Sequence, residues 1–146
     1  MKLTSPQCVA AFKAQMPWAE LHNLYGPTEA AIDVSYWDCR NDCGTSVPIG
    51  KPIQNISLYI LDEHQQLLPV GAAGELYIGG IGLARGYLNR PELTAQSFIN
   101  SPFNASERLY KTGDLVRLTP QLEHQFIGRK DHQVKSVRDV CCWSFR

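Results

Sequence analysis

The sequence predicts an α+β fold that is mostly β, with short antiparallel strands and two or three helices. Three observations support this class: an early segment with helical spacing of apolar residues, β-rich runs from Ile49 onward, and turns rich in glycine or proline between those runs. The chain has 146 residues, 44% of them hydrophobic, which suffices for the core of one domain. We expect a small barrel or sandwich packed on the helix and strand that precede it.

The first two elements are a helix and a strand. The segment "SPQCVAAFKAQMP" (5–17) predicts a helix with Ser5 as its N-cap and with three apolar residues on one face, Val9, Phe12 and Met16. In "AELHNLY" (19–25) apolar and polar residues alternate in part, which predicts a strand. The strand ends at the tight turn that Gly26 and Pro27 predict.

The remainder is predicted as short strands and one helix. Four β-rich runs predict the strands: "ISLYILD" (56–62), "GELYIGG" (74–80), "RLYKTGDLVRLTP" (108–120) and "LEHQFIG" (122–128). The segment "RPELTAQSFI" (90–99) has a proline near its start, which is typical of a helix N-terminus. We expect its apolar residues to share one helix face: Leu93, Phe98 and Ile99.

Overall charge and cysteine usage limit the class of partner. Fourteen basic and fourteen acidic side chains cancel, so no net field favours nucleic acid or an anionic membrane. No apolar run approaches the roughly 20 residues that span a bilayer, and the start lacks the apolar stretch of a signal peptide, so we expect a cytoplasmic protein. The five cysteines are odd in number and lack zinc-ribbon spacing, so we expect reduced thiols: Cys8, Cys39, Cys43, Cys141 and Cys142.

Glycine stands beside charged or hydroxyl residues at four predicted turns, "NLYGPTE", "GGIGLARGYLNRPELT", "YKTGDL" and "GRKDHQVK", which favours a polar ligand held by several turns. Tyr25 could stack on a flat ring, Thr28 could donate to an oxyanion, and Glu29 suits magnesium. Asp114 could accept from a sugar diol, and two cations could meet negative charge, Arg129 and Lys135. At any single position a structural role, such as a turn, a core ring or a cap, stays open as the alternative.

In this order and spacing the four segments resemble the adenylation domains of nonribosomal peptide synthetases, within the adenylate-forming superfamily. The resemblance covers residues 3–135: "NLYGPTEAA" is similar to the family's fifth core motif, "GELYIGGIGLARGYLNRPELT" to the sixth, "YKTGDLVR" to the seventh, and "GRKDHQVK" to the start of the eighth. It implies the C-terminal part of the family's large lobe, which is a helix and strand from an α/β subdomain plus a distorted antiparallel β-barrel.

The resemblance also implies roles for individual residues. Tyr25 would lie against the adenine, Thr28 would contact the α-phosphate, and Glu29 would bind Mg²⁺. Asp131 would be the hinge between the lobes, and Lys135 would be a catalytic lysine. The implied nucleotide-binding set is Asn23, Tyr25, Gly26, Thr28, Asp114, Phe126 and Arg129, and three residues would belong to the side-chain pocket, Leu24, Ile32 and Asp33.

The implied reaction joins ATP and an amino acid into an aminoacyl adenylate, which is then transferred to the phosphopantetheine of a carrier-protein domain. The leucine, isoleucine and aspartate of the pocket resemble those of serine-activating domains. Two alternatives stay open. One is a non-catalytic module that binds nucleotide or complements a separate fragment, and the other is part of an acyl-CoA or aryl-acid ligase.

The chain departs from the family's pattern beyond Lys135. We therefore expect a partial adenylation (AMP-binding) domain over 1–135 and a divergent tail over 136–146, for which a shifted reading frame is a hypothesis. No stretch resembles the family's phosphate loop or its C-terminal lobe, so we expect little or no adenylate formation by these residues alone.

Overall fold

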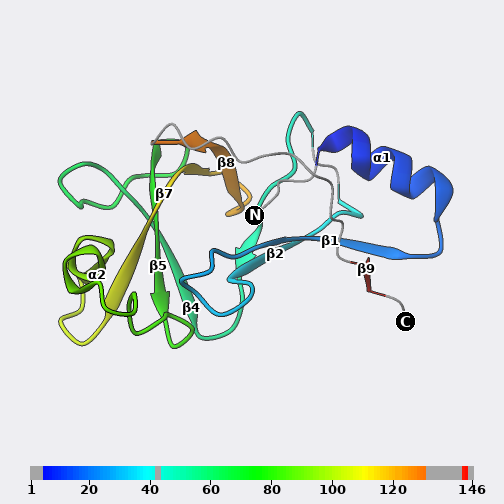
Figure 1. The fold of residues 1–146 in the computed structure, drawn as a ribbon. Coiled ribbons are helices and arrows are strands. Elements are labelled where there is room, and N and C mark those ends of the chain that lie inside the picture. The colour runs from blue at the N-terminus through cyan, green and yellow to red at the C-terminus, as the bar shows by residue number, and fades with distance from the viewer. Residues whose placement is uncertain (1–4, 42–43, 131–142, 145–146) are drawn as a thin grey trace.

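The computed structural model describes residues 5–41, 44–130 and 143–144, which form two antiparallel sheets and two helices (Figure 1). The first sheet has the strand order β3-β2-β1-β9. Its strands are β1 (Glu20–Tyr25), β2 (Ser35–Asp38), β3 (Lys51–Pro52) and β9 (Trp143–Ser144). The predicted strand at 19–25 is therefore confirmed, and it lies in the middle of this sheet.

The second sheet has the order β4-β5-β7-β6, and one further strand, β8, pairs with β7. Its strands are β4 (Ile56–Leu61), β5 (Ala73–Gly80), β6 (Phe98–Asn100), β7 (Arg108–Leu118) and β8 (His124–Arg129). The register shifts within the β5–β7 and β7–β8 pairings, which are irregularities of the kind that bend a strand. The result is a curled antiparallel sheet with a strand in each of the four β-rich runs, which confirms the mostly β fold with a distorted antiparallel barrel that the resemblance implies.

The first helix, α1 (Pro6–Gln15), begins where the sequence predicts. The Ser5 hydroxyl accepts a hydrogen bond from the Cys8 amide at 3.2 Å, and Lys13 in the last turn suits the negative end of the helix dipole. The apolar face is buried through Val9 and Phe12, which pack with Leu21, Trp37, Cys39 and Val47 of the first sheet and its loops. This cluster attaches the helix to β1 and β2.

The second helix, α2 (Pro91–Ser97), is shorter than the sequence predicts. The prediction that Leu93, Phe98 and Ile99 share one helix face is wrong, because the helix ends at Ser97 and the next two residues belong to β6. Phe98 and Ile99 pair with Tyr110 and Leu109 of β7, and Phe98 is buried there while Leu93 stays 45% exposed. Sheet pairing and burial thus outweigh the local helical pattern.

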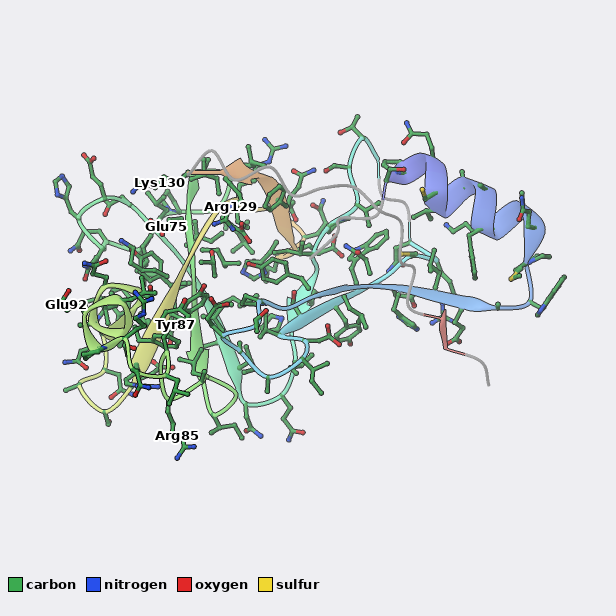
Figure 2. The ribbon with its side chains drawn as sticks, in the orientation of Figure 1. Glu75, Arg85, Tyr87, Glu92, Arg129 and Lys130 are labelled. Atoms are coloured by element: carbon green, nitrogen blue, oxygen red, sulfur yellow. The ribbon has the colours of Figure 1, made fainter. Side chains whose placement is uncertain are left out.

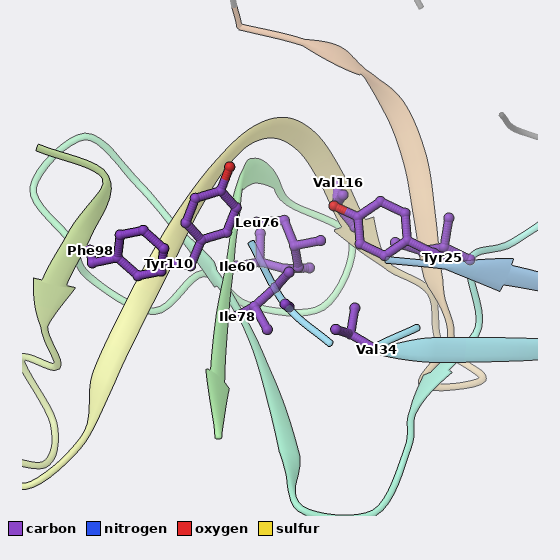
Figure 3. Close-up of a cluster of buried hydrophobic side chains, with 10 residues drawn as sticks. Tyr25, Val34, Ile60, Leu76, Ile78, Phe98, Tyr110 and Val116 are labelled. Atoms are coloured by element: carbon purple, nitrogen blue, oxygen red, sulfur yellow. The ribbon is translucent and has the colours of Figure 1, made fainter. Parts of the chain in front are cut away.

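The main core joins the two sheets, as Figure 3 shows. Tyr25 and Val34 reach it from the first sheet and its loop, and Ile60, Leu76, Ile78, Phe98, Tyr110 and Val116 come from the second. Backbone bonds support the same junction, since the His124 amide donates to the Gly50 carbonyl at 2.9 Å and the Ile49 amide donates to the His124 carbonyl at 2.8 Å. These bonds join the segment before β3 to β8, and the end of β1 packs through Tyr25 into the core between the two sheets. No helix within the described residues is long and apolar enough to cross a membrane.

Candidate nucleotide site

The turn after β1 is folded closely against the segment that follows it. A Cβ at Gly26 would collide with the Ile32 carbonyl oxygen and lie 2.7 Å from the Asp33 Cα, so no larger residue fits without a backbone shift. The Ala30 amide closes the turn by donating to the Pro27 carbonyl at 3.1 Å, and Thr28 is exposed on it. Glycine is thus required here for close backbone approach, and the turn presents Thr28 at the surface.

A buried carboxylate lies directly beside this turn. Asp114 is 2% exposed, and its two oxygens have different partners: the Tyr25 hydroxyl donates to Oδ2 at 2.8 Å, and the Arg129 guanidinium donates to Oδ1 at 2.8 Å. Asp114 and Arg129 stand opposite each other in the β7–β8 pairing, which explains their contact. The Asp114 amide also donates to the Thr112 hydroxyl at 3.0 Å, and that hydroxyl donates to the Leu76 carbonyl at 2.8 Å.

Burial and the neighbouring Asp114 carboxylate raise the pKa of Tyr25 far above its usual range, so its hydroxyl keeps its hydrogen and remains a donor. Both Asp114 oxygens are fixed on protein donors, and a carboxylate oxygen has a second lone pair for a ligand. Three of the seven residues predicted to bind nucleotide, Tyr25, Asp114 and Arg129, therefore meet in one hydrogen-bonded cluster. The Tyr25 ring itself is 1% exposed within the main core, and its contact with an adenine stays a prediction.

Glu29 is held from a different direction. The Tyr87 hydroxyl donates to Glu29 Oε1 at 2.6 Å, and the Ala84 amide donates to the Glu29 carbonyl at 2.8 Å. Figure 2 labels Tyr87, which precedes α2, and Arg129 at the end of β8. Burial first and then the hydrogen bond to Glu29 raise the pKa of Tyr87.

Tyr110 lies close to the Glu29–Tyr87 pair. Burial raises its pKa above the usual range, and the charge of Glu29 and a hydrogen bond with Tyr87 add to this effect. Tyr110 also contributes to the raised pKa of Tyr25. The tyrosines at 87 and 110 were missed in the sequence because an aromatic residue in a strand or loop is first taken as core. Their position inside two of the four glycine-bearing segments was the available signal.

The other predicted site residues occupy varied positions. Asn23 is buried, and its side-chain amide donates to the Pro48 carbonyl at 2.7 Å, while Phe126 packs against the main core. Leu24 points to the opposite face of β1 from Asn23, and Ile32 is 88% exposed. Asp33 is half-buried beside Gly26. Two predicted residues, Asp131 and Lys135, lie outside the described residues, as does most of the 136–146 tail. The roles of all of these remain predictions.

Glu29 offers a single carboxylate to a metal ion. Among the described residues no group of three or more histidine, cysteine, aspartate or glutamate side chains is placed to hold a metal ion. Mg²⁺ is commonly bound by one or two carboxylates together with phosphate oxygens and waters, so one carboxylate is sufficient when the nucleotide supplies the rest. Glu29 therefore fits as the protein ligand of a magnesium–nucleotide complex.

Comparisons with known proteins identify the family of the chain. The profile of the family described as AMP-binding enzyme matches residues 3–88. A component of the mycosubtilin synthase of Bacillus subtilis is 62% identical over 118 residues, which are 80% of this chain and 4% of that protein. Gramicidin S synthase 1 of Brevibacillus brevis is 51% identical over 133 residues, which are 90% of this chain and 12% of that protein.

A solved structure also matches the fold of this chain. The structure of an NRPS protein containing adenylation and PCP domains, bound to a vinylsulfonamide inhibitor, superposes with a TM-score of 0.82 at 35% identity. The match covers 92% of this chain and 24% of that chain. The chain belongs to the AMP-binding enzyme family, and within it corresponds to part of a nonribosomal peptide synthetase adenylation domain.

Proposed function

We propose that this chain supplies the nucleotide-binding part of an adenylation domain, which joins ATP and an amino acid into an aminoacyl adenylate for a carrier protein. The observation that carries the proposal is the Asp114 carboxylate, fixed by the Tyr25 hydroxyl and the Arg129 guanidinium beside the Gly26 turn. Relatives of the same family support it. Since the chain spans 4% to 12% of the two relatives described above, the activity of those whole proteins is part of the proposal.

Each residue has a defined role in this proposal. Asp114 accepts hydrogen bonds from the ribose diol while its protein donors keep it in place, and Arg129 lies where it can contact the same sugar. Thr28 donates to an α-phosphate oxygen from the exposed turn, and Glu29 is the ligand of Mg²⁺. When bound, that cation neutralises charge on the phosphates, so that the amino-acid carboxylate can approach the α-phosphorus. The product would pass to a phosphopantetheine thiol on a carrier domain, in the cytoplasm.

The proposed amino acid is serine. Leu24, Ile32 and Asp33 would line part of the side-chain pocket, where the Asp33 carboxylate accepts the substrate hydroxyl. An amino-acid screen by pyrophosphate exchange in an intact synthetase that carries this segment tests the assignment. Serine should give the highest rate, and an inactive serine would refute the choice of substrate without touching the nucleotide site.

Nucleotide binding by the 146-residue chain is the primary test. We expect isothermal titration to show binding of AMP, and at least about tenfold weaker binding of 2′,3′-dideoxy-AMP, because the Asp114 carboxylate loses its diol partner. In Asp114→Asn the two nucleotides should bind alike. Glu63→Gln removes an exposed carboxylate elsewhere on the chain and should keep the difference. Equal binding of the two nucleotides to the unsubstituted chain would contradict the site.

Catalysis is tested separately. We expect no serine-dependent pyrophosphate exchange from the 146 residues alone, since no stretch resembles the family's phosphate loop. Exchange that appears when a second polypeptide with that loop is added would favour the fragment-complementing alternative. Binding of AMP without exchange under either condition would favour the non-catalytic nucleotide module.

A further inference from the structure

The Glu29 carboxylate has a close partner that the proposed function does not use. The Tyr87 hydroxyl donates to its Oε1 at 2.6 Å, which is within the range for an O–H donor on an ionised carboxylate. Such charge-assisted bonds are about twice as strong as bonds between neutral groups. One oxygen of Glu29 is thereby held by the protein, and the carboxylate is fixed in rotation about its last torsion.

The donor is itself held in place. The Tyr87 amide donates to the Thr94 hydroxyl at 2.9 Å, and its ring meets the Phe98 ring edge-to-face with centroids 5.8 Å apart. The Thr94 hydroxyl in turn donates to the Arg90 carbonyl at 2.9 Å, across the first turn of α2. The Tyr87 ring thus packs on Phe98 of β6, and the Tyr87 backbone is hydrogen-bonded to Thr94 of α2. Both contacts fix the position of the hydroxyl beside Glu29.

The backbone of the loop before Tyr87 is tied to the Glu29 turn as well. The Ala31 amide donates to the Gly82 carbonyl at 2.7 Å, and the Ala84 amide donates to the Glu29 carbonyl at 2.8 Å. The Arg108 guanidinium donates to the carbonyls of Ala84 and Arg85, at 2.6 and 3.1 Å, and so fastens the loop to β7. Main chain and side chain of Glu29 are thus both fixed by the segment 82–87.

We propose that Tyr87 is a positioning residue for the metal-binding carboxylate: its hydroxyl holds Oε1 of Glu29 so that the other oxygen is directed to a divalent cation. The inference rests on the proposed role of Glu29 in binding a magnesium–nucleotide complex. Partners that orient a metal ligand typically contribute tenfold to a hundredfold to metal affinity, because an unfixed ligand pays the ordering cost on binding. A role confined to ring packing on Phe98 would not require the hydroxyl.

The test uses Tyr87→Phe in the 146-residue chain, which keeps the ring and removes the hydroxyl. Binding of ATP is measured twice by NMR, once with chelator and once with Mn²⁺, whose paramagnetic broadening of the Thr28 and Glu29 amides reports the metal. The matched control is Tyr59→Phe, because the Tyr59 hydroxyl also donates to a glutamate, Glu107 Oε2 at 3.2 Å, on another part of the chain. Glu29→Gln serves as the variant without a metal ligand.

We expect Tyr87→Phe to weaken Mn²⁺–ATP binding about tenfold and to leave metal-free ATP binding within about twofold. Tyr59→Phe should change neither, and Tyr87→Phe should have no further effect when added to Glu29→Gln. Unchanged Mn²⁺–ATP affinity, or equal losses with and without metal, would overturn the inference and leave the proposed function standing.

If the unsubstituted chain binds no ATP, the proposed function is refuted. The inference is then tested by the broadening that Mn²⁺ causes in the absence of nucleotide. Broadening at Glu29 that Tyr87→Phe abolishes would still support the positioning role. Equal broadening in both chains, or none in either, would overturn it.

Discussion

The Tyr25 hydroxyl donates to Asp114 Oδ2 at 2.8 Å although the two residues lie 89 positions apart in the sequence. Tyr25 is the last residue of β1 in the first sheet, and Asp114 lies in β7 of the second. The bond thus links the two sheets at the point where the Gly26 turn begins. Tyr25 therefore belongs both to the main core and to the candidate site.

Removing this hydroxyl should destabilise the fold. In Tyr25→Phe the ring still fills the core, but the buried Asp114 carboxylate loses one of its donors. We expect the free energy of unfolding to fall by about 1.5–3 kcal/mol, as for other hydrogen bonds to charged groups. Urea denaturation measures it, with Tyr36→Phe, a 48% exposed tyrosine on β2, as a control expected within about 0.5 kcal/mol of the unsubstituted chain. Equal stability of the two variants would contradict the role of the Tyr25–Asp114 bond.

Gly26 offers a test of the close approach at the turn. Gly26→Ala places a methyl group against the Ile32 carbonyl and should cost about 1–3 kcal/mol of unfolding free energy, because the contact is with backbone that cannot rotate away. Gly128→Ala is the matched control, since a Cβ there meets nothing within 4 Å. We expect that substitution to be neutral or slightly stabilising, because it reduces the entropy of the unfolded chain. A cost for Gly128→Ala as large as for Gly26→Ala would show that the collision is not the cause.

His124 should make stability depend on pH. Burial lowers its pKa, against the opposing effect of the hydrogen bond from its Nδ1 to the Gly50 carbonyl at 2.9 Å. Between the ordinary value of about 6.5 and the lower folded value, the unfolded chain binds more protons than the folded chain, so stability rises with pH in that window. On acidification below about pH 6.5 the free energy of unfolding should fall, by at most about 1.4 kcal/mol per pH unit from this group.

Urea denaturation at pH 7.5, 6.5 and 5.5 measures this slope. His124→Asn keeps a side-chain N–H near the Gly50 carbonyl without an imidazole, and it should flatten the slope between pH 6.5 and 5.5. His64→Asn, which removes an exposed imidazole, controls for the loss of any histidine. If the free energy of unfolding of His124→Asn still falls between pH 6.5 and 5.5, groups other than His124 cause the pH dependence.

The elements that could be predicted from sequence are those with a strong local signal. Ser5 and the Val9–Phe12 spacing specify α1, and the runs at 56–62 and 74–80 specify β4 and β5. At Phe98 the local pattern predicts the wrong element. Its spacing from Leu93 is helical, but the residue lies in a strand because it pairs with Tyr110 across the sheet. That pairing depends on which strand lies next to it, and the pattern of one segment does not contain this information.

The same division applies to the candidate site. The glycine-bearing turns indicated Tyr25, Glu29, Asp114 and Arg129, and three of these meet in one hydrogen-bonded cluster. The fourth residue is Glu29, and its partner Tyr87 could not be inferred from the sequence. The two residues are 58 positions apart and come into contact only when the loop before α2 folds against the Glu29 turn. Candidate site residues can thus be recognised in local motifs, while their hydrogen-bond partners become apparent only in the tertiary structure.

Ile32 carries backbone strain at the edge of the proposed pocket. Its φ of 56° is in the left-handed region, where a β-branched residue is an outlier at a cost of roughly 1–2 kcal/mol, and its side chain is 88% exposed. Ile32→Gly should therefore raise the free energy of unfolding by about 0.5–1 kcal/mol, after allowing for the greater freedom of glycine in the unfolded chain.

Ile53→Gly is the matched control, since Ile53 is an exposed isoleucine outside the left-handed region. That substitution should lower stability by up to about 1 kcal/mol, so the two variants are expected to shift the urea midpoint in opposite directions. A loss of stability in Ile32→Gly would mean that the isoleucine side chain makes compensating contacts. A gain would mean that the chain retains a strained residue which its fold does not need, and strain of that kind is typical of ligand-binding positions.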